Sequence, residues 1–405
     1  MDKILIALLI LACLLGSVCG VFYFLNETNY ASMIEYIDTF AVDVITSDYQ
    51  PALDELGNYY FTTDENFKVL HLTDIHFTGG VLTAEKDRKA INAVAAMVKA
   101  EDPDLVIVTG DIAFAIPDTG TLDNGYAHRM FIRLMDNLGV YWTVTFGNHD
   151  DEAFNTYRRQ AVADMYANET SERCLFSQSP ENVSGMGNHV INIKNTAGEV
   201  TKSLIMMDTH AYVNSDLLFG TIDALLWNYD TIKQDQIDWY RSVIEQYSPD
   251  ASLLFFHIPI RAVKEAYDES IANGKEDTEN TKWLAGVDGE DKTGEMVYAS
   301  RLDDGKFFEE ILKLGNTRGI FFGHDHLNNF VLDYKGVLFS YGYSIDYAAY
   351  DGDLENKGLQ RGCTVLTLTP DGELAAENIV HENYYQDKYQ PQYPKEEVEM
   401  TPLYQ

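Results

Sequence analysis

The sequence places eight Asp, His and Asn side chains directly after short apolar runs, where buried strands would end. These residue types hold divalent metals or transfer protons. In chain order they are Asp74, His76, Asp111, Asn148, His149, His257, His324 and His326. Ligands of open α/β sheets bind beyond the carboxyl ends of the strands, so we expect these side chains to meet at one edge of the sheet.

The set contains the ligand types that a pair of divalent metals needs. Asp111 is a suitable bridging carboxylate, and Asn148 offers a neutral amide oxygen. Imidazole nitrogens come from His76, His257, His324 and His326. Two such metals can hold both the attacking and the leaving oxygen of an in-line displacement, which makes a phosphoester the natural substrate. A single His after a strand is usually structural, so the prediction depends on all the fragments occurring in order.

The apolar runs before these residues are typical of buried strands, and helical patterns at 85–99 and 127–138 alternate with the first of them. This alternation predicts βαβ units and an α/β sheet. The strands that precede the eight residues are expected at 68–72, 105–108, 140–146, 253–256 and 320–322. Further strands with turns between them predict hairpins in the second half, at 189–193, 203–207, 337–341 and 364–369.

Residues 4–25 carry no charge and are long enough for a membrane-spanning helix, which needs about 20 apolar residues. We interpret this stretch as an uncleaved signal anchor. The alternative is a secreted protein whose signal peptide is cleaved near Val18-Cys19-Gly20. Lys3 is the one basic residue before the stretch, and acidic residues follow it, so the positive-inside rule favours a single-pass protein in the cell membrane with its catalytic domain outside the cytoplasm.

Composition divides the rest of the chain into three segments. Residues 26–65 are expected to form a polar connector with one helix around 33–45, residues 66–382 the catalytic domain, and residues 383–405 a loosely packed tail. Within the domain, the acidic segment 264–306 has no sustained periodicity and is expected to be a long insertion. Outside the apolar stretch, two cysteines, Cys174 and Cys363, are either bonded to each other or buried as thiols, the commoner case.

The 405 residues include 64 Asp and Glu against 29 Lys and Arg, which gives a formal charge of −35. A hydrophobic content of 46% excludes a wholly disordered chain. The acidity argues against nucleic acid as the main partner, because phosphate backbones are bound by clustered Lys and Arg. Two divalent metals add about four positive charges at one point, so a small phosphoester remains compatible with the negative charge.

Taken together, the fragments Asp-x-His, Gly-Asp, Gly-Asn-His-Asp, His and Gly-His-x-His resemble the motif of the calcineurin-like metallophosphoesterase superfamily, over roughly residues 67–381. The segments 256–259 and 323–330 resemble most a branch related to purple acid phosphatases. The resemblance implies an α/β fold of two packed mixed sheets flanked by helices in four αββα layers, in addition to the N-terminal transmembrane helix.

The same resemblance implies a role for each site residue. The residues that would hold the first metal are Asp74, His76, Asp111 and His326. Those that would hold the second are Asp111, Asn148, His257 and His324. His149 would contact the phosphate and protonate the leaving group instead of binding metal.

Phe114 departs from the pattern of two related groups. Purple acid phosphatases carry a Tyr at this position that ligates ferric iron, and Ser/Thr protein phosphatases carry an Asp that orients the catalytic His. Phe can do neither, so the resemblance implies Mn²⁺, Fe²⁺ or Zn²⁺ as the two metals and leaves the partner of His149 unidentified. Two other histidines are weaker candidates: His189 is expected to begin an ordinary strand, and His210 lines the cleft or is structural with equal weight.

These inferences predict a phosphomonoesterase that acts on a small substrate through attack by a hydroxide bridging the two metals, with the membrane as a second partner through the N-terminal helix. A phosphodiesterase or pyrophosphatase that acts on nucleotides or lipid head groups is the alternative within catalysis. A non-catalytic surface binding protein is the alternative outside it, and the complete ligand set argues against it. The oligomeric state stays open.

Overall fold

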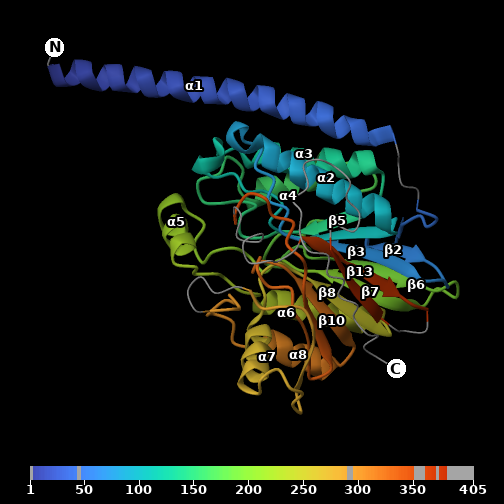
Figure 1. Ribbon diagram of the computed structural model, residues 1–405. Helices are drawn as coiled ribbons and strands as arrows, with labels where there is room; N and C mark the ends of the chain where they lie inside the picture. The colour runs from blue at the N-terminus through green and yellow to red at the C-terminus, as the bar shows by residue number, and fades with distance from the viewer. Residues whose placement is uncertain (1–2, 43–46, 290–294, 351–360, 371–373, 381–405) are drawn as a thin grey trace.

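The computed structural model describes residues 3–42, 47–289, 295–350, 361–370 and 374–380. Its body contains two stacked β-sheets with helices on both outer faces (Figure 1). Within the described residues, the larger sheet has the strand order β1 (Ala52–Leu53), β2 (Tyr59–Thr62), β6 (His189–Lys194), β7 (Val200–Met206), β8 (Ala251–Phe255), β10 (Thr317–Phe322), β12 (Val337–Tyr341), β11 (Val331–Tyr334) and β9 (Thr281–Ala285). The smaller sheet has the order β14 (Leu374–Val380), β13 (Gly362–Leu368), β3 (Phe67–Leu72), β4 (Leu105–Thr109) and β5 (Trp142–Thr145).

The helices form the two outer layers. Those that cover the smaller sheet are α1 (Lys3–Asp38), α2 (Ala84–Glu101), α3 (Asn124–Leu138) and α4 (Arg159–Asn168). Those that cover the larger sheet are α6 (Gln234–Tyr247), α7 (Arg261–Ala272) and α8 (Lys306–Leu314). One helix, α5 (Leu217–Leu225), stands apart from both layers at one end of the body (Figure 1). Short 3₁₀ turns are η1 (Thr39–Val42), η2 (Val81–Thr83) and η3 (Pro117–Thr119).

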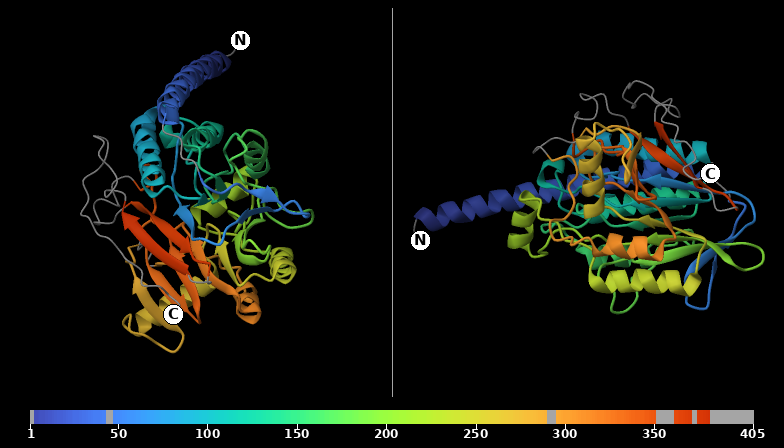
Figure 2. Two further views of the ribbon diagram at one scale, coloured as in Figure 1. Left: turned by 90° about the vertical axis from the view of Figure 1, so that its right-hand side faces the viewer. Right: turned by 90° about the horizontal axis from the view of Figure 1, so that it is seen from below.

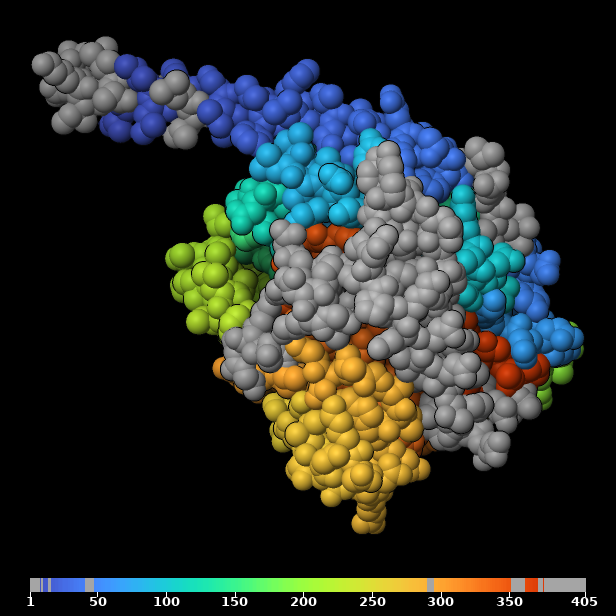
Figure 3. All heavy atoms as spheres, viewed as in Figure 1, coloured from blue at the N-terminus to red at the C-terminus, as the bar shows by residue number. Residues whose placement is uncertain are grey.

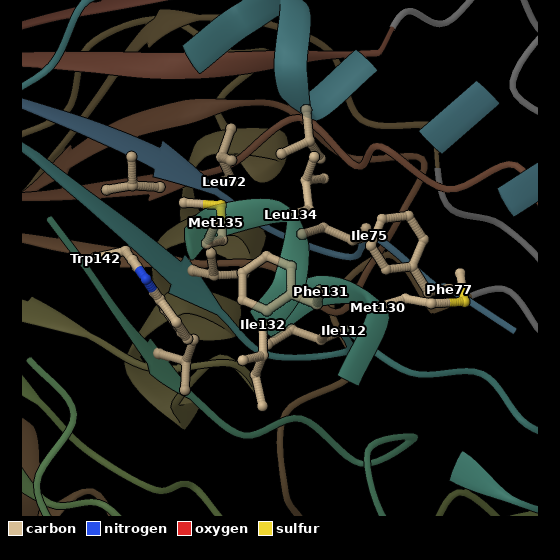
Figure 4. Packing of buried hydrophobic residues seen from close by; sticks show 14 of the residues in the cluster. Leu72, Ile75, Phe77, Ile112, Met130, Phe131, Ile132, Leu134, Met135 and Trp142 are labelled. Carbon is tan, nitrogen blue, oxygen red and sulfur yellow. The ribbon is translucent and has the colours of Figure 1, made fainter. Parts of the chain in front are cut away.

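Three apolar cores hold these layers together. Phe67, Phe255 and Phe321 are fully buried in the core between the two sheets. A second core fills the space between the smaller sheet and its helices, where Phe131 of α3 packs edge-to-face on Trp142 of β5 (Figure 4). The third lies between the larger sheet and α6, α7 and α8. The four-layer fold predicted from the sequence is therefore confirmed.

Strand direction brings the ends of both sheets to one side of the molecule. In the smaller sheet β3, β4 and β5 run parallel, because α2 and α3 provide the crossovers that parallel neighbours require. In the larger sheet β7, β8, β10 and β12 also run parallel. Hairpins join β6 to β7 and β11 to β12, as expected for the second half of the chain. Five of the parallel strands end next to the predicted site residues.

The segment 264–306 is more regular than its composition suggested. It contains most of α7 and the whole of β9, which pairs antiparallel with β11 at the edge of the larger sheet. The lack of sustained periodicity in this part of the sequence therefore does not mean a lack of secondary structure. Helix α7 begins at Arg261, so a boundary drawn at 264 separates Val263 from Ala266 and Tyr267 in the same buried stripe. Residues 290–294 lie outside the described residues.

Helix α1 continues without interruption past the apolar stretch. Among the described residues it is the one helix long and apolar enough to cross a membrane. Its C-terminal part lies along α3, and Met33 and Ile37 are buried in the core of the smaller sheet. The helix expected around 33–45 is thus the end of α1 followed by η1, up to Val42. The boundaries at 25, 65 and 382 stay predictions, and the tail at 383–405 lies outside the described residues.

Candidate metal centre

The predicted site residues meet beyond the carboxyl ends of five strands from both sheets. Asp74 and His76 follow β3, Asp111 follows β4, and Asn148 and His149 follow β5 in the smaller sheet. His257 follows β8, and His324 and His326 follow β10 in the larger sheet. The smaller sheet thus brings the carboxylates and the amide, whereas the larger sheet brings only imidazoles. A site between them depends on how the two sheets stack.

Two groups of side chains are close enough to hold one ion each. The first is Asp74, His76, Asp111 and His326, and the second is Asp111, His257 and His324. Within each group, one ligand atom per residue lies within 4.8 Å of all the others, and every member is buried. Asp111 belongs to both groups, which is the position a bridging carboxylate occupies between two metals.

Oδ2 of Asp111 lies between the two groups. It is 3.4 Å from Nε2 of His76 and 3.1 Å from Nε2 of His257. Its other oxygen, Oδ1, accepts a hydrogen bond of 2.8 Å from the backbone N–H of His149. That bond fixes the rotation of the carboxylate and directs Oδ2 toward the imidazoles. On the far side, Nε2 of His326 is 3.2 Å from Oδ1 of Asp74.

Several polar atoms in this centre are buried and make no hydrogen bond within the described part of the chain. They are both ring nitrogens of His76, Oδ2 of Asp111, Oδ1 of Asn148 and Nε2 of His257. Buried polar atoms in native proteins nearly always have a partner, and a bound ion is one accepted explanation when no protein group provides one. Nitrogen and oxygen donors of this kind suit Mn²⁺, Fe²⁺ or Zn²⁺. The residues therefore fit a pair of divalent metals.

The backbone at four of these residues is strained. Asp74, His76, Asp111 and His324 all have positive φ, between 49° and 79°. Residues other than glycine rarely adopt this left-handed region, and such conformations concentrate at functional sites. Each of these residues lies where the chain turns away from a strand end. The turn directs the side chain across the sheet edge instead of back along the strand.

Close packing of the loops makes two glycines necessary. A Cβ on Gly147 would lie 2.1 Å from Oδ1 of Asp111, and one on Gly323 would lie 2.3 Å from Oδ2 of Asp74. The Asp150 carboxylate then joins the β4 and β5 loops, since it accepts backbone N–H bonds from both Asp111 and Gly147. In the Gly-Asn-His-Asp motif, Gly147 therefore leaves room for Asp111, and Asp150 supports the loop that carries Asn148 and His149.

Neighbouring groups orient the ligands through their remaining polar atoms. Nδ1 of His257 lies 2.7 Å from the carbonyl oxygen of Thr109, so its Nε2 faces Asp111. Nδ1 of His326 lies 3.3 Å from the carboxylate of Asp346. Such outer partners set the tautomer and direction of metal-binding imidazoles. Asp346 follows β12, and nothing in its local sequence identified it in advance.

His149 has a partner that the sequence analysis did not find. Its Nδ1 lies 2.7 Å from Oε1 of Glu152, one turn further along the chain. The Tyr212 hydroxyl accepts a bond of 3.1 Å from the Asn148 amide and lies 3.4 Å from the same Glu152 oxygen. This arrangement turns Oδ1 of Asn148 toward the centre. Phe114 packs edge-to-face on the His149 ring, so at this position it contributes shape without a polar group.

Charge in the centre alternates between carboxylates and imidazoles. Burial by itself would lower the pKa of His257, but the nearby Asp111 carboxylate outweighs it and raises this pKa to about 9. Burial would also lower the pKa of His149, but Asp111 and Glu152 together outweigh it and raise this pKa. The carboxylates therefore attract positive charge strongly, which is the electrostatic requirement for holding cations in a buried site.

The centre opens into a cavity of about 330 Å³. His149, Glu152, His324 and His326 lie on its polar wall. The rest of the lining is largely apolar and aromatic, and it includes Leu225 at the end of α5 and Trp227, two residues beyond it. A larger hollow of about 690 Å³ lies elsewhere, near β1 and the end of α6, but no His or Cys lines it. Of these two cavities, the one at the metal centre is lined by predicted site residues.

Two other histidines lie away from the centre. His189 begins β6, as expected, and is buried between the sheets. Nε2 of His210 is 2.9 Å from the side-chain oxygen of Gln236, and His210 lines a separate hollow beside Arg158. Of the two roles considered for His210, the contact with Gln236 supports the structural one. Cys174 and Cys363 are both buried and form no disulfide within the described residues, which is the default expected for them.

A two-sheet α/β sandwich that assembles carboxylates and imidazoles in two groups around a shared Asp is the arrangement of a dinuclear metallophosphoesterase. The family model described as Calcineurin-like phosphoesterase matches residues 67–328. The chain therefore belongs to the calcineurin-like phosphoesterase family, and its curated relatives include purple acid phosphatase family members.

Two of these relatives come from Arabidopsis thaliana. One, named "Probable inactive purple acid phosphatase 28", is 26% identical over 317 residues, which cover 72% of this chain and 73% of the relative. Another, named "Probable inactive purple acid phosphatase 29", is 23% identical and covers 74% of this chain and 77% of the relative. Among solved structures, a dimetal phosphatase from Danio rerio aligns with a TM-score of 0.46 at 12% identity, over 78% of this chain and 97% of that one.

Proposed function

We propose that this chain is a metal-dependent phosphoesterase, most active as a phosphomonoesterase on a small phosphate-bearing group. The observation that carries the proposal is the cluster of buried, unpartnered ligand atoms around Oδ2 of Asp111. A protein that kept the fold for structure alone would have no need to maintain these costly groups. The two plant relatives described above are named probable inactive, so activity has to be measured on this chain.

The residues that would hold the first metal are Asp74, His76, Asp111 and His326. Those that would hold the second are Asp111, Asn148, His257 and His324. When bound, two divalent metals would supply positive charge to the phosphoryl oxygens and activate water for in-line attack. The metals would be Mn²⁺, Fe²⁺ or Zn²⁺, because Phe114 provides no phenolate for ferric iron.

His149 is the proposed general acid. It lines the cavity, and its Nδ1–H donates to Glu152, which leaves Nε2 as the ring nitrogen that can transfer a proton. Burial would favour the neutral ring, but Asp111 and Glu152 raise the pKa of His149 and so favour the protonated form. A protonated imidazole at this place can donate to the leaving alkoxide.

The first test compares metal content with hydrolysis in the purified full-length chain. With Mn²⁺, Fe²⁺ or Zn²⁺ supplied, we expect two metals per chain and hydrolysis of an aryl phosphate. Asp111→Asn should lose metal and most activity, whereas His149→Ala should keep both metals and lose about 10²–10⁴-fold in kcat/KM. His210→Ala is the matched control, because His210 lies outside the centre.

Two outcomes would contradict the proposal. Fewer than one metal per chain under every condition would favour a binding module, and wild-type activity in His149→Ala would remove the proposed acid. The same assay with a bis-aryl phosphate distinguishes the alternative function, a phosphodiesterase or pyrophosphatase. Faster cleavage of the diester than of the monoester would favour that alternative.

We also propose that α1 anchors the chain in the cell membrane with the catalytic domain on the extracytoplasmic side. Lys3 precedes the apolar stretch and acidic residues follow it, which supports this direction. A membrane-impermeant thiol reagent should label an Ala197→Cys variant in intact cells, since Ala197 is exposed on the β6–β7 turn. Labelling only after lysis would indicate the opposite topology. Recovery of the chain from the medium would indicate that the signal peptide is cleaved.

A further inference from the structure

We propose that α5 is an interfacial helix that inserts its apolar face into the bilayer beside α1, so that the active-site cavity receives phosphate esters carried by membrane lipids. The chemistry rests on the proposed phosphoesterase function and the placement on the proposed anchor. The occupant of the apolar face is the bilayer itself. The small phosphate-bearing group is then the head group of a lipid whose chains stay in the membrane.

The exposed face of α5 is apolar to a degree that is unusual for a helix in water. Its exposed large side chains are Leu217, Leu218, Phe219, Ile222 and Leu225, and the exposed Leu226 and Trp227 follow the helix directly. Leu218 is 64% exposed and Leu226 is 62% exposed, although leucine is normally among the most buried residues. Contiguous apolar patches on soluble proteins mark interaction surfaces.

The polar and small residues of α5 point the opposite way, toward the body. Gly220 is buried against Ala153, and Asp223 is buried and accepts hydrogen bonds from the side chains of Asn214 and Asn228. Arg158 supports the start of the helix by donating to the carbonyl oxygen of Ser215. The helix is therefore held firmly by its polar side and offers its apolar side to the surroundings, the reverse of an ordinary surface helix.

Helix α5 lies at the end of the body from which α1 projects. Figure 1 shows both at the left of the body, and the right-hand view of Figure 2 again puts them at the same end. In the space-filling view, α5 protrudes at that edge (Figure 3). A bilayer crossed by the projecting part of α1 would therefore face α5 and not the sheets.

The first firm contact between α1 and the body fixes how near the bilayer lies. The Asn26 amide donates to the carbonyl oxygen of Gly120 and accepts from the backbone N–H of Val81. Asn26 directly follows the uncharged stretch 4–25, so the body is held at the level where the span ends. Leu82 and Leu122, both exposed, lie within two residues of Val81 and Gly120 in the chain and add apolar surface at this level.

The same helix forms a wall of the catalytic cavity. Thr221, Ala224 and Leu225 of α5 line it together with His149 and His324. The outward residues Leu218 and Leu226 do not belong to that lining. One short helix thus connects the proposed membrane surface with the metal centre. A lipid phosphate could reach the centre without leaving the bilayer completely.

Charge favours a hydrophobic mode of contact over an electrostatic one. Residues 213–229 contain no Lys or Arg, and the chain as a whole carries −35. Basic residues attract a peripheral segment to anionic lipids, so α5 would enter neutral lipid by burial of apolar area. Contact between α5 and the bilayer should therefore be insensitive to salt between about 0.05 and 0.5 M.

The first experiment measures contact directly in the full-length protein held in phosphatidylcholine nanodiscs. Cys13 and Cys19 are replaced by Ser, and a Leu218→Cys variant is labelled with an environment-sensitive dye. Cys174 and Cys363 are buried, and burial raises the pKa of the Cys174 thiol to about 12, so neither competes for the label. Brominated lipid should quench the dye at 218 at least 2-fold and leave an Ala197→Cys dye unchanged.

Equal quenching at positions 218 and 197, or none at 218, would overturn the proposal. Quenching that disappears at high salt would overturn the hydrophobic mode of contact. Discs that hold one chain and discs that hold two are compared, because a second copy of the chain is the other candidate occupant. A dye at 218 that is shielded only in discs with two chains, with no effect of brominated lipid, would identify that copy and reject the bilayer.

The second experiment links α5 to substrate class. The variant Leu218→Glu/Leu226→Glu changes only outward side chains, and Ala197→Glu adds charge at the far end as the control. Metal-loaded protein in nanodiscs acts on phosphatidic acid, a lipid phosphomonoester, or on soluble p-nitrophenyl phosphate. We expect the double variant to lose at least 10-fold on the lipid and to stay within 2-fold on the soluble ester.

Equal loss on both substrates would mean that α5 serves only the fold of the site, and unchanged lipid hydrolysis would mean that its apolar face is not used. Each result rejects the inference. If the wild-type chain hydrolyses neither substrate with any metal, the proposed function fails instead. The dye measurement then still decides whether α5 enters the bilayer.

Discussion

At the scale of single residues, the centre depends on a chain of side chains that runs from a proposed ligand to the proposed acid. Asn148 donates to the Tyr212 hydroxyl, and Glu152 holds Nδ1 of His149 while lying within 3.4 Å of the same hydroxyl. Glu152 is thus a proposed positioning residue, because its contact with His149 would orient the proposed acid. This network links the direction of the acid to the direction of the metal ligand Asn148.

Glu152→Ala should lower kcat about 10-fold to 100-fold on an alkyl phosphate and much less on p-nitrophenyl phosphate, whose leaving group needs little protonation. Glu152→Gln should recover part of the loss, because its amide oxygen still accepts from Nδ1–H of His149. Steady-state kinetics on both esters, with metal content measured in parallel, checks the prediction. An equal loss on both esters, or loss of metal, would show that Glu152 serves the structure of the site instead.

The sequence could predict the residues that end strands but not those that orient them. Asp74, Asp111 and His257 each follow an apolar run, so strand order and the sheet-edge rule were enough to bring them together. Asp346 and Tyr212 follow no such signal, and their roles depend on how two sheets stack and how loops fold over them. Glu152 was within reach, since it lies three residues after His149, but that spacing has meaning only once the loop is known to turn there.

At the scale of elements, one histidine connects the two sheets. His189 begins β6 of the larger sheet, and its Nε2 lies 2.7 Å from Oγ1 of Thr143 in β5 of the smaller sheet. Its Nδ1–H donates to the carbonyl oxygen of Gly187, so Nε2 is the acceptor and the ring is neutral. Complete burial lowers the pKa of His189 to about 4.

This depressed pKa makes the sheet contact sensitive to acid. The unfolded chain binds a proton at His189 near pH 6.5, whereas the folded chain does so only near pH 4, so stability is lost as the pH falls between these values. At pH 5 the cost from this residue is about 2 kcal/mol. His189→Gln should flatten the change in unfolding free energy between pH 7.5 and 5, measured with urea. An unchanged slope would contradict the assignment of a neutral, buried ring.

The local sequence pattern also could not show whether the apolar face of a helix is buried or exposed. The apolar run of α5 is as hydrophobic as a core helix, and only the structure shows that Leu218 and Leu226 face outward. Conversely, the charged Lys264 and Asp268 of α7 obscure its buried stripe in the sequence. The structure shows that this stripe belongs to a helix beside β9 and β11. Periodicity identifies a face of a helix, but the partner of that face is decided by tertiary packing.

At the scale of the whole molecule, the proposed membrane helix and the two-sheet body share one hydrophobic core. Met33 and Ile37 of α1 are buried with residues of α2 and α3, and polar contacts such as Tyr126 to Glu27 support the same interface. The last part of α1 therefore belongs to the folded body. It is a structural element and not only a tether.

Ile37→Ala should destabilise the body by about 2–5 kcal/mol, because it leaves a cavity between α1 and α3. Ser32→Ala, on the exposed side of the same helix, should change the free energy of unfolding by less than about 0.5 kcal/mol. Chemical denaturation of both variants in the same detergent provides the comparison. If the two variants behaved alike, α1 would be a passive anchor.

The uninterrupted path of α1 from the apolar stretch into the body has a kinetic consequence under the proposed membrane placement. With no flexible linker after Leu25, the catalytic cavity cannot swing away from its own membrane to sample the surrounding solution. Encounters with a lipid substrate would then occur by lateral diffusion in two dimensions. Turnover would follow the mole fraction of substrate in the bilayer, and diluting the membrane with inert lipid would slow the reaction even at a constant total amount of substrate.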